Sequence, residues 1–439
     1  MTNEIQQILD RLGMARLNQM QLNTYREVTG TDADVVVVSP TGSGKTLAYM
    51  LPLAGMIDVS SDAVQAVVIV PNRELALQSA EVMCRFGLHI RTVCCYGGRP
   101  AMDEHRVIRQ VAPHVVFGTP GRLNDHFDKG NLSPYTARFL VIDEFDKCLE
   151  MGFHNEMAKL LKRLSGVRRR FLLSATDADR IPDFVNARHV AKVDYSEGGI
   201  SSRVEQYCLK SADKDKLEAL GNLLCTIGRQ SSMVFLNYRD SVERVASYLR
   251  GRGFGVSAFH GGLEQPEREA ALYRFGNGSA NVLVSTDLAS RGLDIPDVDN
   301  IIHYHMPLTR ESYIHRVGRT ARWDATGKSF FILSPDESLP DFVEKECSPI
   351  MLPEQMPGVP QPKMETLYIG KGKKDKISKG DIVGFLCKKG GLDSSAIGRI
   401  DVRERYCYVA VSREKVGQVL SMAGGEKIKG IKTIVEVVR

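Results

Sequence analysis

Two short stretches carry the residue types best suited to phosphate chemistry. The first is SPTGSGKT, residues 39–46, which follows the apolar run DVVVV and precedes the helical run LAYMLPLAGM. Its glycines let backbone N–H groups approach phosphate oxygens closely, and the N-terminus of the following helix favours negative charge. Lys45 is then expected to reach the β and γ phosphates, and Thr46 a Mg²⁺ ion. The alternative is a plain turn rich in Gly, Ser and Thr.

The second stretch is DEFD, residues 143–146, which ends the apolar run FLVI. A negative patch buried beside nothing is costly, so a buried strand that ends in three acids indicates a cation nearby. We expect a neighbouring strand end of this kind to lie beside residues 39–46. Asp143 would then hold the metal, partly through water, and Glu144 would orient or deprotonate an attacking water. A solvated cluster of acids at a strand end is the alternative.

Short β-rich runs alternate with longer amphipathic segments between residues 30 and 195 and again between residues 203 and 346. This alternation is typical of a parallel sheet joined by crossover helices. The sequence therefore predicts two α/β lobes, over residues 1–200 and 201–347. The expected strands are DVVVVSP, AVVIVP, RTVCCYG, HVVFGTP, FLVIDE and RFLLSAT, then SSMVFLN, GVSAFHG, NVLVSTD, NIIHYHMP and KSFFILS.

A proline-rich segment separates these lobes from a different kind of module. Residues 348–363 hold five prolines and predict an extended, semi-stiff linker. Residues 364–439 follow a β-α-β-β-α-β pattern, which predicts a small α+β domain of the RRM-like type.

The charge of the chain is concentrated in this last module. The net charge is +5, but residues 364–439 alone carry +7, which leaves −2 for the rest. A small basic module at a terminus points to a polyanionic partner, although a solvated surface would give the same charge.

Composition excludes several classes of protein. Hydrophobic residues make up 43% and charged residues 25%, and no apolar run approaches the roughly 20 residues that span a bilayer. The polar N-terminal segment lacks the layout of a secretory signal. Nine scattered cysteines without a C-x-x-C pair argue against a zinc site and indicate thiols in a reducing cytoplasm.

Seven short motifs occur in an order and spacing that resemble the DEAD-box RNA helicases. They are SPTGSGKT, PNREL, TPGR, DEFD, SAT, STDLASRGLDIP and HRVGRTAR, and the resemblance covers about residues 10–346. It implies two RecA-like lobes and an enzyme that hydrolyses the β-γ phosphoanhydride bond of ATP with Mg²⁺ when RNA is bound.

The same resemblance assigns residues to the ATP site. The nucleotide-binding positions are Gln21, Thr41, Gly42, Ser43, Gly44, Lys45, Thr46, Gly292 and Asp294. Arg319 and Arg322 of the second lobe are expected to reach the γ-phosphate, where an arginine is worth ~10³ to 10⁵ in rate. Asp146, Ser174 and Thr176 are expected to couple this site to RNA, or else to serve only the strand-to-turn structure.

RNA is expected to lie across both lobes, which would contact its sugar-phosphate backbone. Such contacts position a strand without reading its sequence. The matching positions are Pro71, Arg73, Gly98, Thr119 and Arg122 in the first lobe, and Arg268, Thr286 and Asp287 in the second.

Four positions depart from the family pattern. Phe145 replaces the alanine of DEAD, and we expect its ring to fill the interior between sheet and helix. Met14 and Leu17 stand where an aromatic and a proline are usual in the segment that reads adenine. Ala321 replaces the last glycine of the arginine motif, with little expected effect.

The last module resembles the RNA-binding domain of DbpA-type bacterial DEAD-box proteins. In that subfamily the domain recognises a hairpin of large-subunit ribosomal RNA during ribosome assembly. The candidate contacts are Lys371, Lys373, Lys374, Lys376, Lys427, Lys429 and Lys432. Tyr406 or Tyr408 would serve as a platform for a stacked base, or else would pack within the sheet.

The sequence thus predicts a monomeric, cytoplasmic, ATP-dependent RNA helicase that acts on large-subunit ribosomal RNA and ribosome precursors, without a membrane partner. Two alternatives are an ATP-gated RNA clamp that barely hydrolyses ATP and a DNA helicase. Intact Lys45, Glu144, Arg319 and Arg322 argue against the clamp, and the RRM-like module argues against DNA.

Overall fold

The computed structural model describes residues 3–40, 42–98, 101–176, 181–195, 204–290, 298–320, 327–343 and 347–438. These residues form two compact units, which are the first lobe and the second lobe together with the C-terminal module, called the tail domain below. Within the described ranges, no helix combines the length and the apolar character needed to cross a bilayer.

The first lobe contains a fully parallel sheet in the order β3-β4-β2-β5-β6-β1-β7. Its strands are β1 (Val35–Val38), β2 (Ala66–Ile69), β3 (Thr92–Cys95), β4 (Val115–Gly118), β5 (Phe139–Ile142), β6 (Arg169–Ser174) and β7 (Ala191–Asp194). All six expected strands are present. The seventh, β7, was not predicted.

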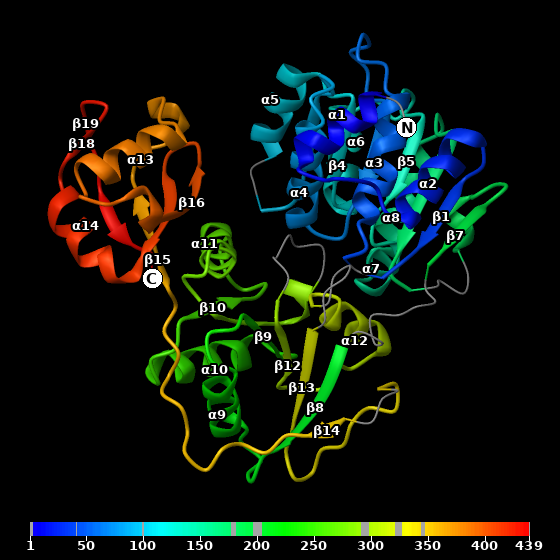
Figure 1. Cartoon of the computed structure of the whole chain (residues 1–439). Coiled ribbons are helices and arrows are strands. Elements are labelled where there is room, and N and C mark those ends of the chain that lie inside the picture. Colours follow the sequence, from blue (N-terminus) through cyan, green and yellow to red (C-terminus); the bar gives the residue numbers. More distant parts are fainter. Residues whose placement is uncertain are drawn as a thin grey trace. The chain divides into compact units, whose positions relative to one another are not determined.

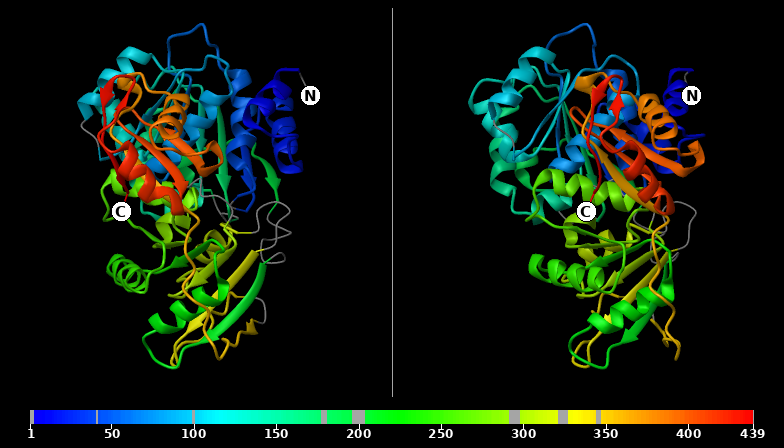
Figure 2. Two further views of the ribbon diagram at one scale, coloured as in Figure 1. Left: turned by 60° about the vertical axis from the view of Figure 1, so that its left-hand side comes forward. Right: turned by 90° about the vertical axis from the view of Figure 1, so that its left-hand side faces the viewer.

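Helices cover both faces of this sheet (Figure 1, Figure 2). Alternate strand residues point to opposite faces, so Ala66 and Val68 join one apolar core while Val67 and Ile69 join the other. The helices of the first core are α1 (Asn3–Leu12), α2 (Gln19–Gly30), α3 (Lys45–Met56) and α4 (Arg73–Arg85). Those of the second are α5 (Ala101–Val111), α6 (Pro120–Asp128), α7 (Phe145–Glu150) and α8 (His154–Arg163), with the short η1 (Asp183–Val185).

The second lobe repeats the design with the order β10-β11-β9-β12-β13-β8-β14, again parallel. Its strands are β8 (Val204–Lys210), β9 (Ser232–Phe235), β10 (Val256–Phe259), β11 (Val282–Ser285), β12 (Asn300–His303), β13 (Gly327–Leu333) and β14 (Ser348–Pro349). Its helices are α9 (Leu217–Ile227), α10 (Arg239–Gly251), α11 (Gln265–Gly276), η3 (Asp287–Ser290) and α12 (Arg310–Val317). The predicted fold class is confirmed.

The proline-rich segment is extended but does not stand away from the second lobe. Its first residues form β14 beside β8, and Ile350, Leu352 and Val359 pack on the apolar core of that lobe. The Gln361 side-chain amide donates to the Gly253 carbonyl at 2.9 Å. The segment is therefore a strap along the second lobe rather than a spacer.

The tail domain is an antiparallel sheet in the order β16-β17-β15-β20, with helices α13 and α14 packed on one face (Figure 1). The strands are β15 (Met364–Ile369), β16 (Ile397–Val402), β17 (Cys407–Ser412) and β20 (Val435–Val437), and the helices are α13 (Lys379–Lys388) and α14 (Val416–Ala423). The short turns η4 (Lys373–Asp375), η5 (Ser394–Ala396) and η6 (Arg413–Lys415) connect them. A two-stranded hairpin, β18 (Lys427–Ile428) and β19 (Ile431–Lys432), is an addition to the expected pattern.

Candidate functional site

The phosphate loop, residues 39–46, connects β1 to α3 and depends on Gly44. This residue has φ 87° in the left-handed region and forms the N-cap of α3. A Cβ atom there would lie 2.4 Å from the side-chain nitrogen of Gln21. The buried Lys45 ammonium donates to the carbonyl of Ser39 and, at 3.1 Å, to that of Pro40. The backbone therefore requires glycine at position 44, and a larger side chain would also displace the Gln21 amide.

Gln21 and Asn18 brace the phosphate loop from the start of α2. Gln21 donates its amide to the Gly44 carbonyl at 3.2 Å, and Asn18 donates to the Ser43 carbonyl at 2.9 Å. The two residues also form a reciprocal capping box at the start of the helix. Gln21 was predicted from the sequence and Asn18 was not, although the N-x-x-Q spacing at a helix start was a usable signal.

Asp143 lies beside the phosphate loop. Its carboxylate accepts a hydrogen bond from Thr46 Oγ1 at 3.4 Å. Burial raises the pKa of this carboxyl to about 6, against the opposing effects of Lys45, the Glu144 N–H and Thr46. A cation bound here would stabilise the ionised carboxylate and so lower its pKa again. The expectation of directly neighbouring strands is wrong in detail, because β6 pairs with both β1 and β5.

Glu144 has an unusual backbone. It follows β5 with φ 50° and ψ 52° and caps α7. A left-handed conformation at a non-glycine residue costs about 1–3 kcal/mol and is kept only where the surroundings enforce it. The next residue, Phe145, is 1% exposed and joins the core between the sheet and α8, so the interior position expected for its ring is confirmed.

The three predicted coupling residues lie together at the ends of β5 and β6. The Asp146 carboxylate accepts from Thr176 Oγ1 at 3.2 Å and from the Ala175 N–H at 3.3 Å. Ser174 Oγ in turn donates to the Thr176 carbonyl at 2.5 Å. The acid motif and the SAT motif are therefore one hydrogen-bonded unit.

The phosphate loop and its surroundings fit a bound nucleoside triphosphate. The buried hydroxyl oxygen of Ser43 has no hydrogen-bond partner among the described residues, and such an atom calls for a ligand or water. The lysine, the glycines and the buried acid Asp143 are all within this one region. Of the predicted nucleotide contacts, Thr41, Gly292 and Asp294 lie outside the described residues.

The five predicted RNA contacts of the first lobe follow three adjacent strands, β3, β4 and β2. Gly98 has φ 87°, and a Cβ atom there would lie 2.8 Å from a guanidinium nitrogen of Arg73. Arg73 also lies over the ring of Tyr96 at 5.5 Å. Thr119 is the N-cap of α6, and Pro71 is buried just before α4. One half of the sheet edge thus holds the phosphate loop and the acids, and the other half holds these residues.

In the second lobe, the fully buried Arg316, which was not predicted from the sequence, binds the carboxylate of Asp287. Arg316 donates its Nε and Nη2 to the carboxylate of Asp287 at 2.5 and 3.2 Å, and also donates to Asn237 and the His305 carbonyl. Asp287, predicted to contact RNA, therefore has its carboxylate engaged inside the lobe. Thr286 is half-buried beside it, and Arg268 donates to the carbonyls of residues 261 and 263.

The predicted catalytic arginines belong to the segment after α12. Arg319 is 2% exposed, and its carbonyl accepts from the Val298 N–H. Arg322 lies outside the described residues, as does Ala321.

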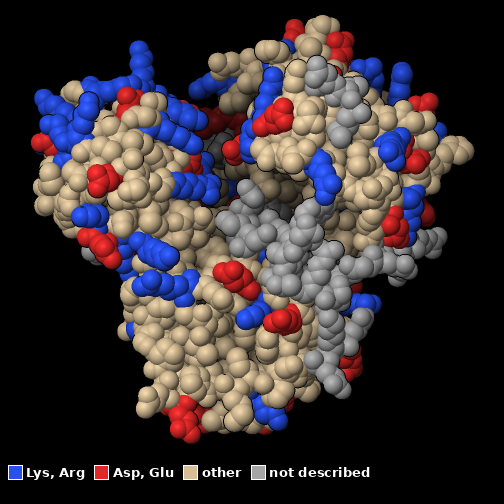
Figure 3. Space-filling model, viewed as in Figure 1, with Lys and Arg blue, Asp and Glu red and all other residues tan. Residues whose placement is uncertain are grey.

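In the tail domain, the predicted lysine contacts come from two loops that touch. Lys429 donates to the Lys376 carbonyl at 2.9 Å and pairs with Asp381 at 2.7 Å. Lys371 pairs with Asp375 at 3.4 Å. Lys373, Lys374, Lys427 and Lys432 are exposed, and Figure 3 shows basic side chains gathered over this domain at the upper left.

The open face of the tail sheet packs against α11. The Tyr273 hydroxyl donates to the Arg399 carbonyl at 2.5 Å, and the Tyr273 and Tyr408 rings lie 5.2 Å apart. Asn277 donates to Thr366 Oγ1 at 2.9 Å. Tyr408 is only 7% exposed, which favours the packing alternative for this residue, whereas Tyr406 is half-buried.

Comparison with known proteins agrees with this geometry. Three family models match in order: DEAD/DEAH box helicase over residues 18–184, helicase conserved C-terminal domain over 215–324 and DbpA RNA binding domain over 366–437. The chain is 35% identical to the ATP-dependent RNA helicase DbpA of Escherichia coli (strain K12), over 96% of this chain and 94% of that protein. The chain belongs to the DEAD-box RNA helicases.

Further relatives of this helicase support the same assignment. It is 30% identical to the ATP-dependent RNA helicase DbpA of Bacillus subtilis (strain 168), with 90% of each chain covered. Among solved structures it is similar to Mss116p bound to ssRNA and AMP-PNP, with a TM-score of 0.69, 26% identity, and 76% of this chain and 73% of that chain covered. As a DEAD-box helicase the protein is an ATP-hydrolysing enzyme that binds RNA.

Two of the departures from the family pattern lie in the core of this helicase. Leu17 is buried, and Met14 packs against the same apolar cluster as α1 and α2. Both side chains therefore anchor the segment that carries Asn18 and Gln21 to the first lobe.

Proposed function

We propose that this helicase locally unwinds structured ribosomal RNA of the large subunit during ribosome assembly. The observation that carries the proposal is the tail domain, which matches the DbpA RNA binding domain over residues 366–437 and holds a net charge of +7 over residues 364–439. The proposed setting is the cytoplasm, with the protein acting as a monomer. The nine cysteines, all within the described ranges, are thiols rather than disulfides, which fits a reducing compartment.

The proposed ATP site assigns each residue one task. Thr46 and Asp143 would hold Mg²⁺, partly through water, and the ion would supply positive charge to the phosphates. Lys45 binds the phosphates and Glu144 orients the attacking water. Arg319 and Arg322 add positive charge as the phosphoryl group leaves, while Gly292 and Asp294 hold the nucleoside.

The proposed RNA path uses the two lobes for grip and the tail domain for choice of target. The residues after β2, β3, β4 and β11 would contact the sugar-phosphate backbone of the RNA and hold the RNA strand without regard to its sequence. The tail domain would raise the local concentration of the two lobes near one RNA element. The exposed lysines of the tail domain support RNA binding on their side of the domain. The open face of the tail sheet is instead packed against α11.

The test is ATPase stimulation by a panel of large-subunit ribosomal RNA fragments of equal length. The wild-type chain should show a lower half-saturating concentration for one fragment than for the others. The triple variant Lys373→Gln/Lys374→Gln/Lys427→Gln should lose that preference. In a plot of the logarithm of the RNA binding constant against the logarithm of the salt concentration, the slope should also become less steep by about 0.7–0.9 for each lysine that contacts a phosphate.

A matched control removes three partly exposed lysines of the first lobe instead, namely Lys129, Lys159 and Lys192. This variant has the same net charge as the tail variant and should keep the preference. If the wild-type chain does not discriminate among the fragments, the ribosomal assignment fails while the helicase assignment stands.

A further inference from the structure

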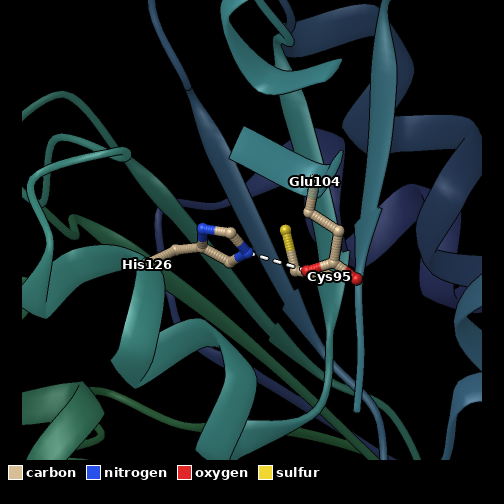
Figure 4. Close-up of side chains that lie close together, drawn as sticks. All are labelled: Cys95, Glu104 and His126. Carbon is tan, nitrogen blue, oxygen red and sulfur yellow. Dashed lines mark hydrogen bonds and ion pairs between the residues drawn. The ribbon is translucent and has the colours of Figure 1, made fainter. Parts of the chain in front are cut away.

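Beneath the RNA-facing half of the first lobe lies a buried cluster of Cys95, Glu104 and His126 (Figure 4). Glu104 comes from α5 and is 4% exposed, and the other two side chains, from β3 and α6, are fully buried. The Glu104 carboxylate accepts from Arg122 Nε at 2.7 Å, from His126 Nε2 at 2.8 Å and from the Tyr96 N–H at 3.2 Å. One acid therefore joins the loop after β3 to two residues of α6.

The charge state of the cluster follows from these contacts. Burial by itself would raise the pKa of Glu104, but the hydrogen bonds from His126, Arg122 and the Tyr96 N–H hold it below its ordinary value of 4.5. An ionised carboxylate only accepts, so His126 Nε2 carries the proton. Its Nδ1 then accepts from the Asn131 amide at 3.1 Å. Both ring nitrogens of His126 therefore have a hydrogen-bond partner.

The three ligand-type atoms lie within 4.8 Å of one another, as in a metal site. The geometry argues against one, because a metal on this carboxylate would lie next to the Arg122 guanidinium, 2.7 Å from the same oxygen. Burial also raises the pKa of Cys95 well above its ordinary value, so the thiolate that a metal needs is disfavoured. The cation of this cluster is Arg122 itself.

The partners of Glu104 connect the three segments assigned to RNA. Arg122 is in the first turn of α6 after Thr119, and its side chain is 15% exposed while that of Glu104 is 4% exposed. Tyr96 precedes the Gly97–Gly98 turn and lies under Arg73 of α4. The acid thus holds the loop after β3 and the start of α6 directly, and the start of α4 through Tyr96.

We propose that Glu104 is a positioning residue for RNA binding, which fixes the Arg122 guanidinium by its Nε–H and ties the three RNA segments into one rigid surface. The proposal rests on the proposed function in one respect, that Arg122 contacts the RNA backbone. Glu104 itself lies below that surface and touches no substrate.

The test compares Glu104→Gln with wild type in the full-length chain, using a single-stranded RNA to stimulate ATPase activity. The half-saturating RNA concentration should rise about tenfold, while the KM for ATP moves less than about twofold. The control is Asp34→Asn, which alters another buried carboxylate of the first lobe that accepts from the Arg170 and Arg188 N–H groups. That control should lower the melting temperature without shifting the RNA concentration.

A double-mutant cycle separates this proposal from the proposed function. If Glu104 acts mainly through Arg122, the half-saturating RNA concentration of Glu104→Gln/Arg122→Ala should rise by clearly less than the product of the two single effects. Fully multiplicative effects would overturn the positioning role. An unchanged RNA requirement in Arg122→Ala would instead overturn the assigned RNA contact.

Two further measurements keep the proposal testable if Glu104→Gln does not fold. Arg122→Lys keeps the positive charge but removes the Nε–H, so it should raise the half-saturating RNA concentration about as much as Glu104→Gln. Wild-type RNA binding by this variant would overturn the proposal. So would stoichiometric binding of Zn²⁺ by the wild-type chain that Cys95→Ala abolishes.

Discussion

Three residues in or beside the phosphate loop adopt states that are unfavourable in free energy. Glu144 has a left-handed backbone, Asp143 is buried with its pKa raised to about 6, and the buried Ser43 hydroxyl has no partner in the described part of the chain. A site that binds its ligand tightly commonly shows such features, because the ligand supplies what is missing. Because all three lie around one loop, they indicate that the nucleotide binds there.

Gly44 provides the sharpest residue-scale prediction. Gly44→Ala forces a side chain into a left-handed backbone and places Cβ 2.4 Å from Gln21 Nε2. We expect nucleotide affinity to fall at least about tenfold, with a stability loss of about 1–2 kcal/mol. Titration with a fluorescent ATP analogue and thermal unfolding measure the two effects.

The control for this prediction is Gly55→Ala. Gly55 is exposed in α3 and has no atom within 4 Å of an added Cβ. Alanine there should leave nucleotide affinity unchanged and raise stability by up to about 1 kcal/mol. Equal affinity in Gly44→Ala and Gly55→Ala would contradict the assignment of the loop.

Glu104 yields a prediction on pH. Its pKa is lowered in the folded chain, so its contribution to stability is fully present above the unfolded value near 4.5 and is lost as pH falls through the lower, folded value. The melting temperature of wild type should therefore fall more steeply below pH 4.5 than that of Glu104→Gln, which has no proton to gain. If the melting temperatures of wild type and Glu104→Gln changed in parallel between pH 3 and pH 7, the neighbours of Glu104 would not lower its pKa.

At the scale of elements, the sequence predicted what apolar runs can reveal. Every predicted strand of the two lobes is present, because buried parallel strands are continuous apolar runs. The strands β7, β8 and β14 were missed. The sequence of β8, VEQYCLK, mixes buried, half-buried and exposed residues, and β14 has two residues within a proline-rich segment. Such strands depend on their neighbours in the sheet rather than on their own composition.

The candidate site was predictable to the same extent. Gln21, Lys45, Thr46 and Asp143 lie together as their motifs implied. Three residues that hold the motifs in place, Asn18, Glu104 and Arg316, were not predicted. Asn18 had a usable signal in the N-x-x-Q spacing, whereas Arg316 lies inside HRVGRTAR, where only Arg319 and Arg322 were assigned a role. Glu104 belongs to no motif and is 18 residues away from Arg122 along the chain. Sequence order alone does not show which distant side chains meet.

The packing of the tail sheet on α11 gives an element-scale prediction. Tyr273 contributes a hydrogen bond, a ring contact with Tyr408 and a cation–π contact with Arg399 at 5.6 Å. Tyr273→Ala should therefore release the tail domain and speed proteolytic cleavage within residues 348–363 several-fold. Limited proteolysis followed by mass spectrometry measures the rate at that segment.

Tyr238→Ala is the matched control, since Tyr238 is 66% exposed in the same lobe. It should leave cleavage within residues 348–363 unchanged. Equal rates in wild type and Tyr273→Ala would show that other contacts, such as the hydrogen bond between Asn277 and Thr366, suffice to hold the tail domain.

At the scale of the whole molecule, binding and turnover depend on different parts of the chain. The phosphate loop and the two acids assigned to catalysis, Asp143 and Glu144, belong to the first compact unit, whereas Arg319 belongs to the second. Under the proposed assignment, the first lobe can therefore bind ATP without this arginine. Hydrolysis, under the proposed mechanism, needs charge from both units, and so the two steps should respond differently to the loss of Arg319.

Arg319→Gln tests this division of labour. We expect kcat for RNA-stimulated ATP hydrolysis to fall about 10³-fold or more, as when an arginine that stabilises the leaving phosphoryl group is removed. Affinity for a fluorescent ATP analogue in the absence of RNA should change less than about twofold. Arg310→Gln, which removes an exposed arginine at the start of α12, is the control and should keep its turnover. Equal turnover in wild type and Arg319→Gln would overturn the catalytic role assigned to Arg319.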